Sequence, residues 1–429
     1  MRGMNSSTVD LIYLDPPFNS KANYAAPIGS KAAGAAFKDT WTLDDLDIEW
    51  LDLIESKHPA LHRVIMAAMT DSDKSYLVYM AVRLLEMHRL LKPTGSIYLH
   101  CDPTMSHYLK LLVDAIFGRT QFRNEIVWQR DVAGKGAKKT SGQWPRLHDV
   151  LLLYSKSDSW TFLQAHKELT DKQKKGYRYI EEETERRYKA VQLGDYSDAS
   201  ISRMMKEGLI HTSSTGKQYK KYYLDEAKAT VGSIWDDIMG FGVRTAAKER
   251  VGYPTQKPLA LLDRILKASS NEEDVVLDPF CGCATTCVSA ELLERNWVGI
   301  DISEKAYELV NIRLRKKQGA KYYRDGSKQA SILEEVIHRK DIPQRTDLGK
   351  LPKYNSEENK RSLYGAQGGD CASCKEHFGI RHLEVDHIVA RSKGGSNHIS
   401  NLQLLCGHCN RVKGNRGMEY LRTRLRLAA

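Results

Sequence analysis

The sequence has no apolar run approaching the roughly 18 residues that span a bilayer, so we expect no membrane-spanning helix. Its first residues also lack the basic, apolar and small-residue regions of a secretory signal peptide. Internal repeats and long low-complexity tracts are missing as well. With 41% hydrophobic and 28% charged residues, the composition excludes a wholly disordered, collagen-like or membrane-embedded chain. We therefore expect a cytoplasmic globular protein.

An acidic excess is absent too. The chain has 65 Lys and Arg residues against 54 Asp and Glu residues, a formal net charge of +11. A basic balance favours an anionic partner, and nucleic acid is a better fit than a membrane surface. The 429 residues leave room for two or three domains.

Strand-like and helix-like segments alternate in two parts of the chain. Predicted strands are 9–14, 96–101, 275–280 and 297–302, and predicted helices are 74–91, 104–117, 259–268, 285–294 and 304–317. This alternation predicts an α/β fold with a doubly wound, Rossmann-like parallel sheet.

The intervening region differs in character. Lysine and tyrosine interleave at 216–223, and lysine and glycine dominate 134–139. Both segments could follow a DNA backbone, with tyrosines stacking on bases, or could be flexible surface loops. The segment 167–187 carries charges of both signs and is predicted to be a solvated helix. Residues 318–363 are predicted to be a polar linker.

The segment DLIYLDPPF (10–18) ends a predicted strand in an acid, two prolines and an aromatic residue. Prolines remove amide donors and leave carbonyl oxygens free as acceptors. With the aspartate, they could accept both hydrogens of the exocyclic amino group of a base, while the aromatic ring stacks on an extruded base. A plain turn at the sheet edge is an equal alternative for this motif by itself.

A second pattern is VVLDPFCGCATT (275–286) followed by WVGIDIS (297–303). A strand leads through small residues into a helix, and the next strand ends in Asp301. Small residues allow a close backbone approach, and an acid after the second strand can bind ribose hydroxyls. The spacing suits a cofactor that contains a nucleoside, with a structural turn as the less favoured alternative.

Together, DPPF (15–18), YPTQKP (253–258), DPFCGCATT (278–286) and GIDI (299–302) resemble the amino methyltransferases of DNA, in the motif order of the β class. These enzymes transfer a methyl group from S-adenosylmethionine to the N6 of adenine or the N4 of cytosine. The resemblance implies a catalytic half at 1–130, a target-recognition region with flanking sheet strands at 131–250, and a cofactor-binding half at 251–317. It implies that the base is held by Asp15, Pro16, Pro17 and Phe18, and the cofactor by Asp278, Phe280, Gly282, Asp301, Thr255, Gln256 and Lys257.

DPPF favours adenine N6 by resemblance, because cytosine N4 enzymes more often begin this motif with serine. Two departures affect the cofactor site. Ala284 stands where many relatives have glycine, a mild change at negative φ and a costly one at positive φ. Relatives usually carry a further strand and acidic loop before DPPF, and we expect that element to be missing here. Either the start of the sequence is clipped, or the cofactor pocket is open and weakened.

Near the C-terminus, Cys371-x-x-Cys374 and Cys406-x-x-Cys409 form two knuckles. Four thiolates at this spacing suit a closed tetrahedral zinc site, with a redox pair as the minor alternative. A module of this size buries little core, so the metal would supply folding energy.

The residues between and after the knuckles resemble an HNH endonuclease of the ββα-metal type, which predicts a small zinc-stapled domain at 364–429. The resemblance implies that Asp386 and Asn410 bind one Mg²⁺ or Mn²⁺ ion. It implies further that His387 activates water and that Asn401 orients the loop holding His387. A non-catalytic zinc module that binds DNA is the alternative for this domain.

The whole chain is thus expected to combine a methyltransferase for double-stranded DNA with an HNH nuclease, as in restriction-modification. The alternatives are an N4-cytosine enzyme with the same fusion, a DNA-binding protein with a degenerate cofactor pocket, and a methyltransferase of RNA. The target sequence stays open, as does the oligomeric state, for which a homodimer is one option.

Overall fold

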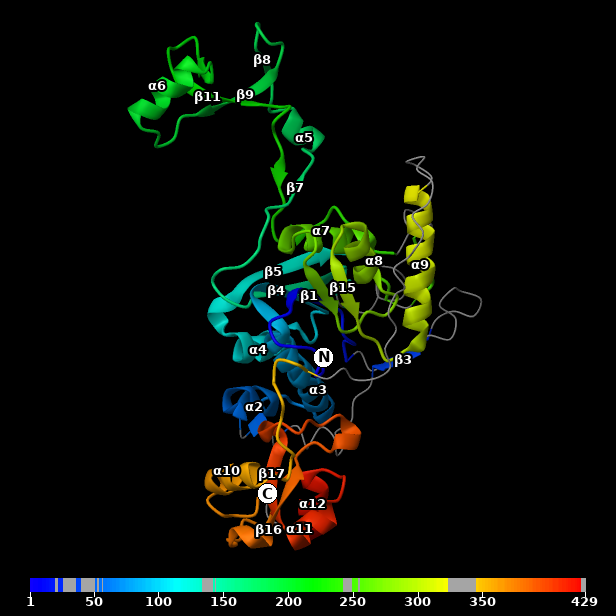
Figure 1. The fold of residues 1–429 in the computed structure, drawn as a ribbon. Helices are drawn as coiled ribbons and strands as arrows, with labels where there is room; N and C mark the ends of the chain where they lie inside the picture. Colours follow the sequence, from blue (N-terminus) through cyan, green and yellow to red (C-terminus); the bar gives the residue numbers. More distant parts are fainter. Residues whose placement is uncertain are drawn as a thin grey trace. The chain divides into compact units, whose positions relative to one another are not determined.

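The computed structural model describes residues 1–19, 22–25, 36–39, 51, 54–55, 57–132, 142, 144–241, 249–253, 255–322 and 345–425. Its central element is a seven-stranded sheet of order β13-β5-β6-β4-β1-β14-β15 (Figure 1). The strands are β1 (Val9–Leu14), β4 (Leu91–Cys101), β5 (Phe122–Gln129), β6 (His148–Ser155), β13 (Ile234–Trp235), β14 (Val275–Asp278) and β15 (Asn296–Gly299). Neighbouring strands run parallel except at β6, which is antiparallel to β4 and β5. The predicted α/β fold with a mostly parallel sheet is confirmed.

Helices pack on the sheet in two groups. One group holds α2 (Pro59–Met66), α3 (Asp71–Leu90) and α4 (Ser106–Phe117), and the other holds α7 (Leu259–Ser269), α8 (Thr285–Leu292) and α9 (Glu304–Tyr322). Figure 1 shows α3 and α4 on one side of the sheet and α7 and α8 on the other. Because both faces are covered, the central strands are largely buried: all six residues of β1 and the last seven residues of β4 are buried.

A separate compact unit spans Leu163–Gly232. It contains the sheet β10-β11-β9-β8, the helix α6 (Asp198–Lys206) and the two-stranded pair β7 (His166–Lys167) and β12 (Ala229–Thr230). The sheet strands are β8 (Tyr179–Ile180), β9 (Arg187–Gln192), β10 (Ile210–Thr212) and β11 (Gln218–Tyr223). The segment 216–223 therefore contributes a paired strand, whereas 134–139 lies outside the described residues.

The helix predicted over 167–187 is wrong for most of its length. The structure has only the four-residue helix α5 (Asp171–Lys174), which begins at a Thr170 capping box. Gly176 follows it, and the chain then enters β8 and β9. Tyr188 on β9 is buried against the ring of Tyr223 on β11. Burial of these rings in the unit's core overrides the charge pattern from which the helix was predicted.

The C-terminal module has two antiparallel strands, β16 (Leu383–His387) and β17 (Leu402–Cys406), followed by α11 (Gly407–Lys413). This is the ββα order predicted for it. Its core includes Leu363, Leu383, Leu404, Leu405 and Leu421. The helix α10 (Glu357–Gln367) begins within the segment predicted as linker, and α12 (Met418–Leu425) closes the module.

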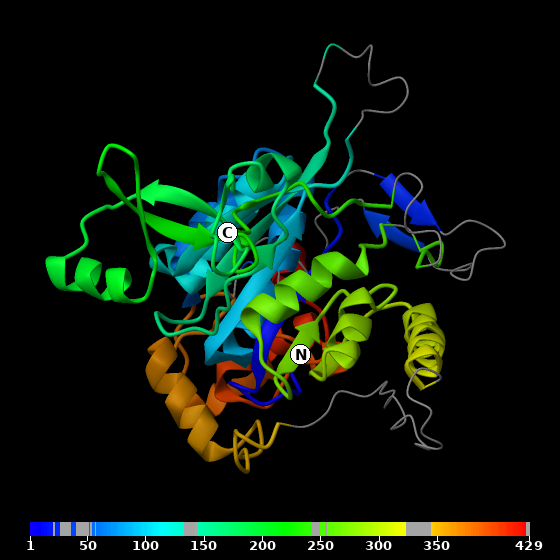
Figure 2. The ribbon, with the colours of Figure 1, turned by 90° about the horizontal axis from the view of Figure 1, so that it is seen from above.

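A short antiparallel ladder lies between β1 and α2 in the sequence. The strands β2 (Ala22–Ala25) and β3 (Ala36–Asp39) pair as an antiparallel ladder, drawn in dark blue in Figure 2. Among the helices that the structure describes, none is long and apolar enough to cross a membrane.

Candidate functional site

A cavity of about 650 Å³ lies where β1 and β14 end. Because the carboxyl ends of parallel strands meet at one sheet edge, motifs that are distant in the sequence converge there. The cavity is lined by every residue predicted to bind the base or the cofactor: Asp15, Pro16, Pro17, Phe18, Thr255, Gln256, Lys257, Asp278, Phe280, Gly282 and Asp301.

The two carboxylate oxygens of Asp15 have different surroundings. Oδ2 accepts a hydrogen bond from the ammonium of Lys257, whose side chain is itself buried. Oδ1 is buried and has no hydrogen-bond partner among the described residues. The same ammonium lies 5.5 Å from the centre of the Phe18 ring. Asp15 thus offers one free acceptor, Oδ1, beside an aromatic face, while Oδ2 is held by the Lys257 ammonium.

Asp278 ends β14 at the other side of the cavity. It accepts hydrogen bonds from the hydroxyl of Thr286 (2.6 Å) and the amide of Phe280 (3.1 Å). Burial raises the pKa of Asp278 to about 7 against the opposing effect of these hydrogen bonds. The group therefore changes charge near neutral pH.

Asp301 follows β15 and joins that strand to the turn between β14 and α8 (279–284), which is named the cofactor turn after the motif predicted there. One oxygen accepts from the amide of Gly282 (2.8 Å) and the other from the amide of Ser303 (2.7 Å). Burial raises its pKa although the backbone hydrogen bonds oppose that rise. The carboxylate braces the turn and remains part of the cavity wall.

The cofactor turn contains two residues in the left-handed region. Gly282 has φ 49°, and a Cβ there would lie 3.0 Å from the ring of Tyr253. Ala284 has φ 58° and ψ 38°, which is the costlier of the two cases considered for this position. The turn keeps this conformation beside a buried Arg313, whose guanidinium donates to the carbonyl of Cys283 (2.6 Å) and the hydroxyl of Thr285 (2.9 Å).

The residues of the 253–258 motif differ in what they do. The Gln256 side chain donates to the carbonyl of Glu249 (3.0 Å) and accepts from the amide of Val251 (2.9 Å). Both ends of its amide are therefore used to hold the preceding loop. Thr255 has φ 62°, and its carbonyl accepts from Lys257 (3.2 Å). Lys257 is the member of this motif that reaches the DPPF segment (15–18), through Asp15.

Tyr79 and Arg83 on α3 are among the lining residues that were not predicted from the sequence. The guanidinium of Arg83 lies 3.3 Å from the centre of the Tyr79 ring. They are spaced four apart, so a helical pattern could have placed them on one face. Nothing in the sequence links that face to the cavity.

A second, smaller cavity of about 290 Å³ lies in the C-terminal module and is lined by Asp386, His387 and Lys413. His387 is buried, and its Nε2 lies 2.9 Å from the side-chain oxygen of Asn397. Oδ2 of Asp386 accepts from Gln403 (2.9 Å) and pairs with the fully buried ammonium of Lys413 (3.1 Å). Both contacts use Oδ2, so Oδ1 is the oxygen that could reach an ion.

Asn401 is buried below the loop that follows His387. Its Oδ1 accepts from the amide of Val389 (3.0 Å), while its Nδ2 donates to the carbonyls of Val389 and Ser396 (3.0 Å each). Gly395 packs against the same carbonyl, since a Cβ there would lie 1.8 Å from it. Asn401 therefore holds both sides of the loop.

Asn410 stands apart from the second cavity's lining. Its side-chain nitrogen donates to Glu384 (2.6 Å) on β16, two residues before Asp386. The amide oxygen of Asn410 is not used in that bond. The structure thus brings Asp386 and His387 together and ties Asn410 to the same strand through Glu384.

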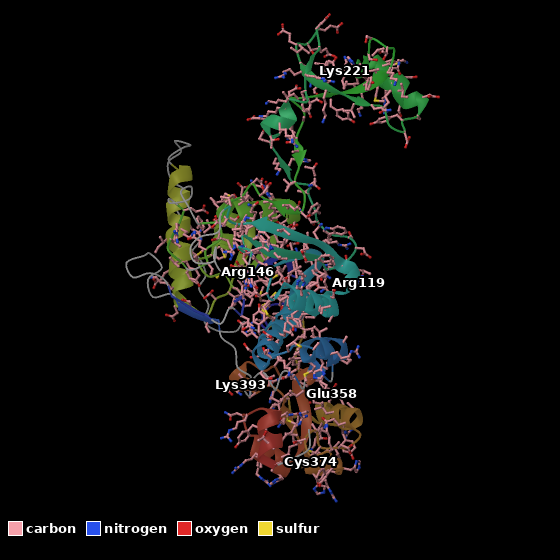
Figure 3. The ribbon with its side chains drawn as sticks, turned by 180° about the vertical axis from the view of Figure 1, so that it is seen from behind. Arg119, Arg146, Lys221, Glu358, Cys374 and Lys393 are labelled. Atoms are coloured by element: carbon pink, nitrogen blue, oxygen red, sulfur yellow. The ribbon has the colours of Figure 1, made fainter. Side chains whose placement is uncertain are left out.

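Cys371, Cys374, Cys406 and Cys409 cluster, with their sulfur atoms within 4.8 Å of one another. The amide of Cys406 donates to Cys371 Sγ (3.3 Å), and the amide of Cys409 donates to Cys406 Sγ (3.4 Å). Amide donors stabilise thiolate charge, so this donor set fits a tetrahedral zinc ion. Figure 3 labels Cys374 within the module.

Comparison with protein families supports the motif assignment. A family described as "DNA methylase" matches residues 9–312, and an HNH endonuclease family matches residues 371–416.

Individual relatives cover most of the chain at low identity. The type II methyltransferase M.EcaI of Enterobacter cloacae is 28% identical over 322 residues, covering 68% of this chain and 62% of its own length. The DNA adenine methyltransferase YhdJ of Escherichia coli K12 is 25% identical over 353 residues, covering 82% of this chain and 89% of its own. The chain thus spans less than two thirds of the first of these relatives. Among solved structures, the M1.HpyAVI–SAM complex aligns with TM-score 0.35 at 15% identity, covering 72% of this chain and 89% of that one.

Proposed function

The chain belongs to the DNA methylase family and carries an HNH endonuclease domain, and we propose that it methylates the N6 of adenine in double-stranded DNA and also cleaves DNA. The observation that carries the first part is the free, buried Oδ1 of Asp15 beside Phe18, in the cavity that the cofactor motif also lines. S-adenosylmethionine would supply the methyl group there.

The residues of the cavity would act by position and charge. Oδ1 of Asp15 accepts one hydrogen of the amino group, and Phe18 stacks on the extruded base. Lys257 holds the other oxygen of Asp15, Oδ2, and so orients the side chain. S-adenosylmethionine, when bound, would supply the methyl group to the amino nitrogen in line and leave as its thioether, and the proton lost from the nitrogen would pass through Asp15 Oδ1 to solvent. Orientation of the two reactants supplies most of the rate in such a transfer.

At the cofactor end, the carboxylates of Asp278 and Asp301 and the close backbone at Gly282 suit the ammonium and ribose groups of S-adenosylmethionine. Asp301 already uses both oxygens on backbone amides, so a ribose hydroxyl would share an oxygen with one of them.

The preference for adenine rests on the first residue of DPPF, since serine is more usual there in enzymes that modify cytosine N4. The relative named as a DNA adenine methyltransferase supports the same preference. Cytosine N4 is the alternative product.

For cleavage, His387 would take a proton from the attacking water. Asp386 Oδ1 and the amide oxygen of Asn410 form a set of hard oxygen donors that suits Mg²⁺ or Mn²⁺. Such an ion would stabilise the charge that develops on the phosphate and the leaving oxygen.

Nucleoside mass spectrometry tests the methyltransferase directly. The chain is expressed with His387→Ala, to limit DNA damage, in a host that lacks DNA methylation. We expect N6-methyladenine in the host DNA and none with Asp15→Ala added. N4-methylcytosine would establish the alternative base. No modified base would favour a DNA-binding protein with a degenerate cofactor pocket. Light scattering on the purified chain distinguishes a monomer from a homodimer.

A further inference from the structure

A chain of buried polar groups lies behind the catalytic segment. The hydroxyl of Tyr13 on β1 is 2.9 Å from Nδ1 of His100 on β4. Nε2 of His100 is 3.2 Å from Oδ2 of Asp149 on β6, and Oδ1 of Asp149 pairs with Arg130 (3.0 Å). His100 is completely buried, and Tyr13 lines the first cavity.

The ring of His100 is also held by its aromatic neighbours. It lies 6.0 Å from the Phe18 ring, at an interplanar angle of 27°, in a stacked arrangement. Trp128 meets it edge-on at 5.6 Å and 90°, and the Trp128 indole is fixed by donating to the carbonyl of Ile238 (2.7 Å). Phe18 therefore rests against an imidazole that has little freedom to turn.

The partners fix the direction of each hydrogen bond. The pKa of Asp149 lies below its ordinary value; burial opposes this, but the hydrogen bond from His100 and the charges of Lys257 and Arg130 outweigh it. An ionised Asp149 can only accept, so His100 must donate from Nε2. In the neutral ring Nδ1 is then the acceptor, and the hydroxyl of Tyr13 donates to it.

Burial of this hydrogen-bonded network costs folding free energy. Burying an imidazole and a carboxylate in a sheet of apolar strands loses solvation that apolar residues would not lose. Within the network, His100 contacts Phe18, and Tyr13 forms part of the cavity wall. A role in the site therefore explains why polar groups occupy positions that apolar residues could fill.

We propose that His100 is a positioning residue of the methyltransferase site, which Asp149 holds in one tautomer so that it fixes the rings of Phe18 and Tyr13 where the extruded base binds. The proposal rests on the proposed methyltransferase function. It adds to that function a preorganised group of side chains on β1, β4 and β6, which fixes the geometry of the base pocket before the substrate binds.

Nitrogen-15 NMR tests the tautomer without any activity measurement. The full chain is labelled at histidine, and the His100 signals are those that disappear in His100→Phe. We expect a protonated Nε2 and an unprotonated Nδ1 in the wild type. In Asp149→Asn the amide can donate to Nε2, so we expect the proton to move to Nδ1. A wild-type ring protonated at Nδ1 alone would overturn the proposal.

Kinetics of the purified chain, without added divalent ion, test the positioning role. His100→Phe keeps a flat ring and loses both hydrogen bonds, and Tyr13→Phe loses one. We expect each to lower kcat for methylation by about 10- to 100-fold, as small misplacements of reactants do. Calorimetry should find the affinity for S-adenosylmethionine changed by less than about twofold, since the cofactor contacts are elsewhere. Tyr98→Phe is the matched control, because it removes a buried hydrogen bond from the same strand, to Ser269 (2.8 Å).

A double-mutant cycle with Phe18→Ala separates positioning from general packing. If His100 acts through Phe18, His100→Phe should lower kcat far less in the Phe18→Ala background than in the wild type. An equal loss of kcat in both backgrounds, or an equal loss of kcat in Tyr98→Phe, would overturn the proposal. A wild-type chain with no methylation would instead overturn the proposed function. Should His100→Phe fail to fold, Tyr13→Phe and Asp149→Asn carry the same comparison.

Discussion

The ammonium of Lys257 pairs with the carboxylate of Asp15, although the two residues are 242 positions apart in the sequence. Asp15 belongs to the segment after β1, and Lys257 belongs to the segment before α7. The pair therefore ties the DPPF segment (15–18) to the half of the domain that carries DPFCGCATT (278–286). Neither segment has a complete site without the other.

Replacement of Lys257 by methionine should lower methylation by at least about tenfold, which corresponds to roughly 1.4 kcal/mol. The change keeps the length of the side chain but leaves the carboxylate of Asp15 without its counter-charge in a partly buried place. Lys267→Met is the control, since Lys267 is exposed on α7. Steady-state kcat is the measurement, and equal rates for Lys257→Met and the control would contradict the assigned role.

Binding of S-adenosylmethionine should strengthen as the pH rises from 6 to 8. Burial raises the pKa of Asp278 to about 7, so the group is mostly protonated below that pH and ionised above it. Only the ionised form attracts the ammonium of the ligand, so affinity should fall by up to about tenfold for each pH unit below 7. Calorimetry at several pH values measures this. Asp278→Asn should bind weakly, with a flat profile; a variant that keeps the wild-type slope would assign the titration to another group.

Chelation of zinc should unfold the C-terminal module and leave cofactor binding intact. The four clustered thiols lie beside the core of that module, where the metal would contribute much of the folding free energy. Limited proteolysis after treatment with a zinc chelator, with S-adenosylmethionine binding followed in parallel, makes the comparison. Cys406→Ser should behave like chelation, whereas Cys101→Ser, outside the cluster, should not. Loss of cofactor binding on chelation would show that the two domains depend on each other.

Asn401→Ala should abolish DNA cleavage and keep methylation. The substitution removes three hydrogen bonds that hold the loop after His387, at a cost on the order of 2–3 kcal/mol to the module. Ser400→Ala is the control, because Ser400 is exposed and, among the described residues, its hydroxyl hydrogen-bonds only to the half-buried His398. Plasmid nicking with added Mg²⁺ or Mn²⁺ is the assay. Cleavage that survives Asn401→Ala at the wild-type rate would remove this residue from the nuclease site.

Sequence patterns located the strands β1, β4, β14 and β15 and the helices α3, α4, α7, α8 and α9, including the charged α9. Strands β1 and β4 and the helices α4 and α7 follow from buried segments bounded by proline or glycine. Charge alone was a poor guide over 167–187, because charges of both signs accompany exposed helices and exposed strands equally well. There the burial of Tyr188 and Tyr223 decided the structure.

The motifs of the site were likewise visible in the sequence, but their partners were not. DPPF and YPTQKP could each be named, yet no local pattern pairs Lys257 with Asp15. The alternation of β1 places Tyr13 on the same side as Asp15, but its contact with His100 depends on which strands are neighbours. The pairing of β1 with β4 and of β4 with β6 is a property of the folded sheet. The conformation of Ala284 was an open question that only the backbone could answer.

Strands β7 and β12 pair at the base of the unit Leu163–Gly232, with Lys167 opposite Ala229 and His166 opposite Thr230. The two ends of this unit therefore lie side by side. The entropic cost of closing a loop rises by only about 0.6 kcal/mol for each doubling of its length. Inserts of very different size are therefore tolerated at this position. A replacement of the whole unit by recombination would have to match only two neighbouring chain ends, so this part of the protein can change in evolution independently of the seven-stranded sheet.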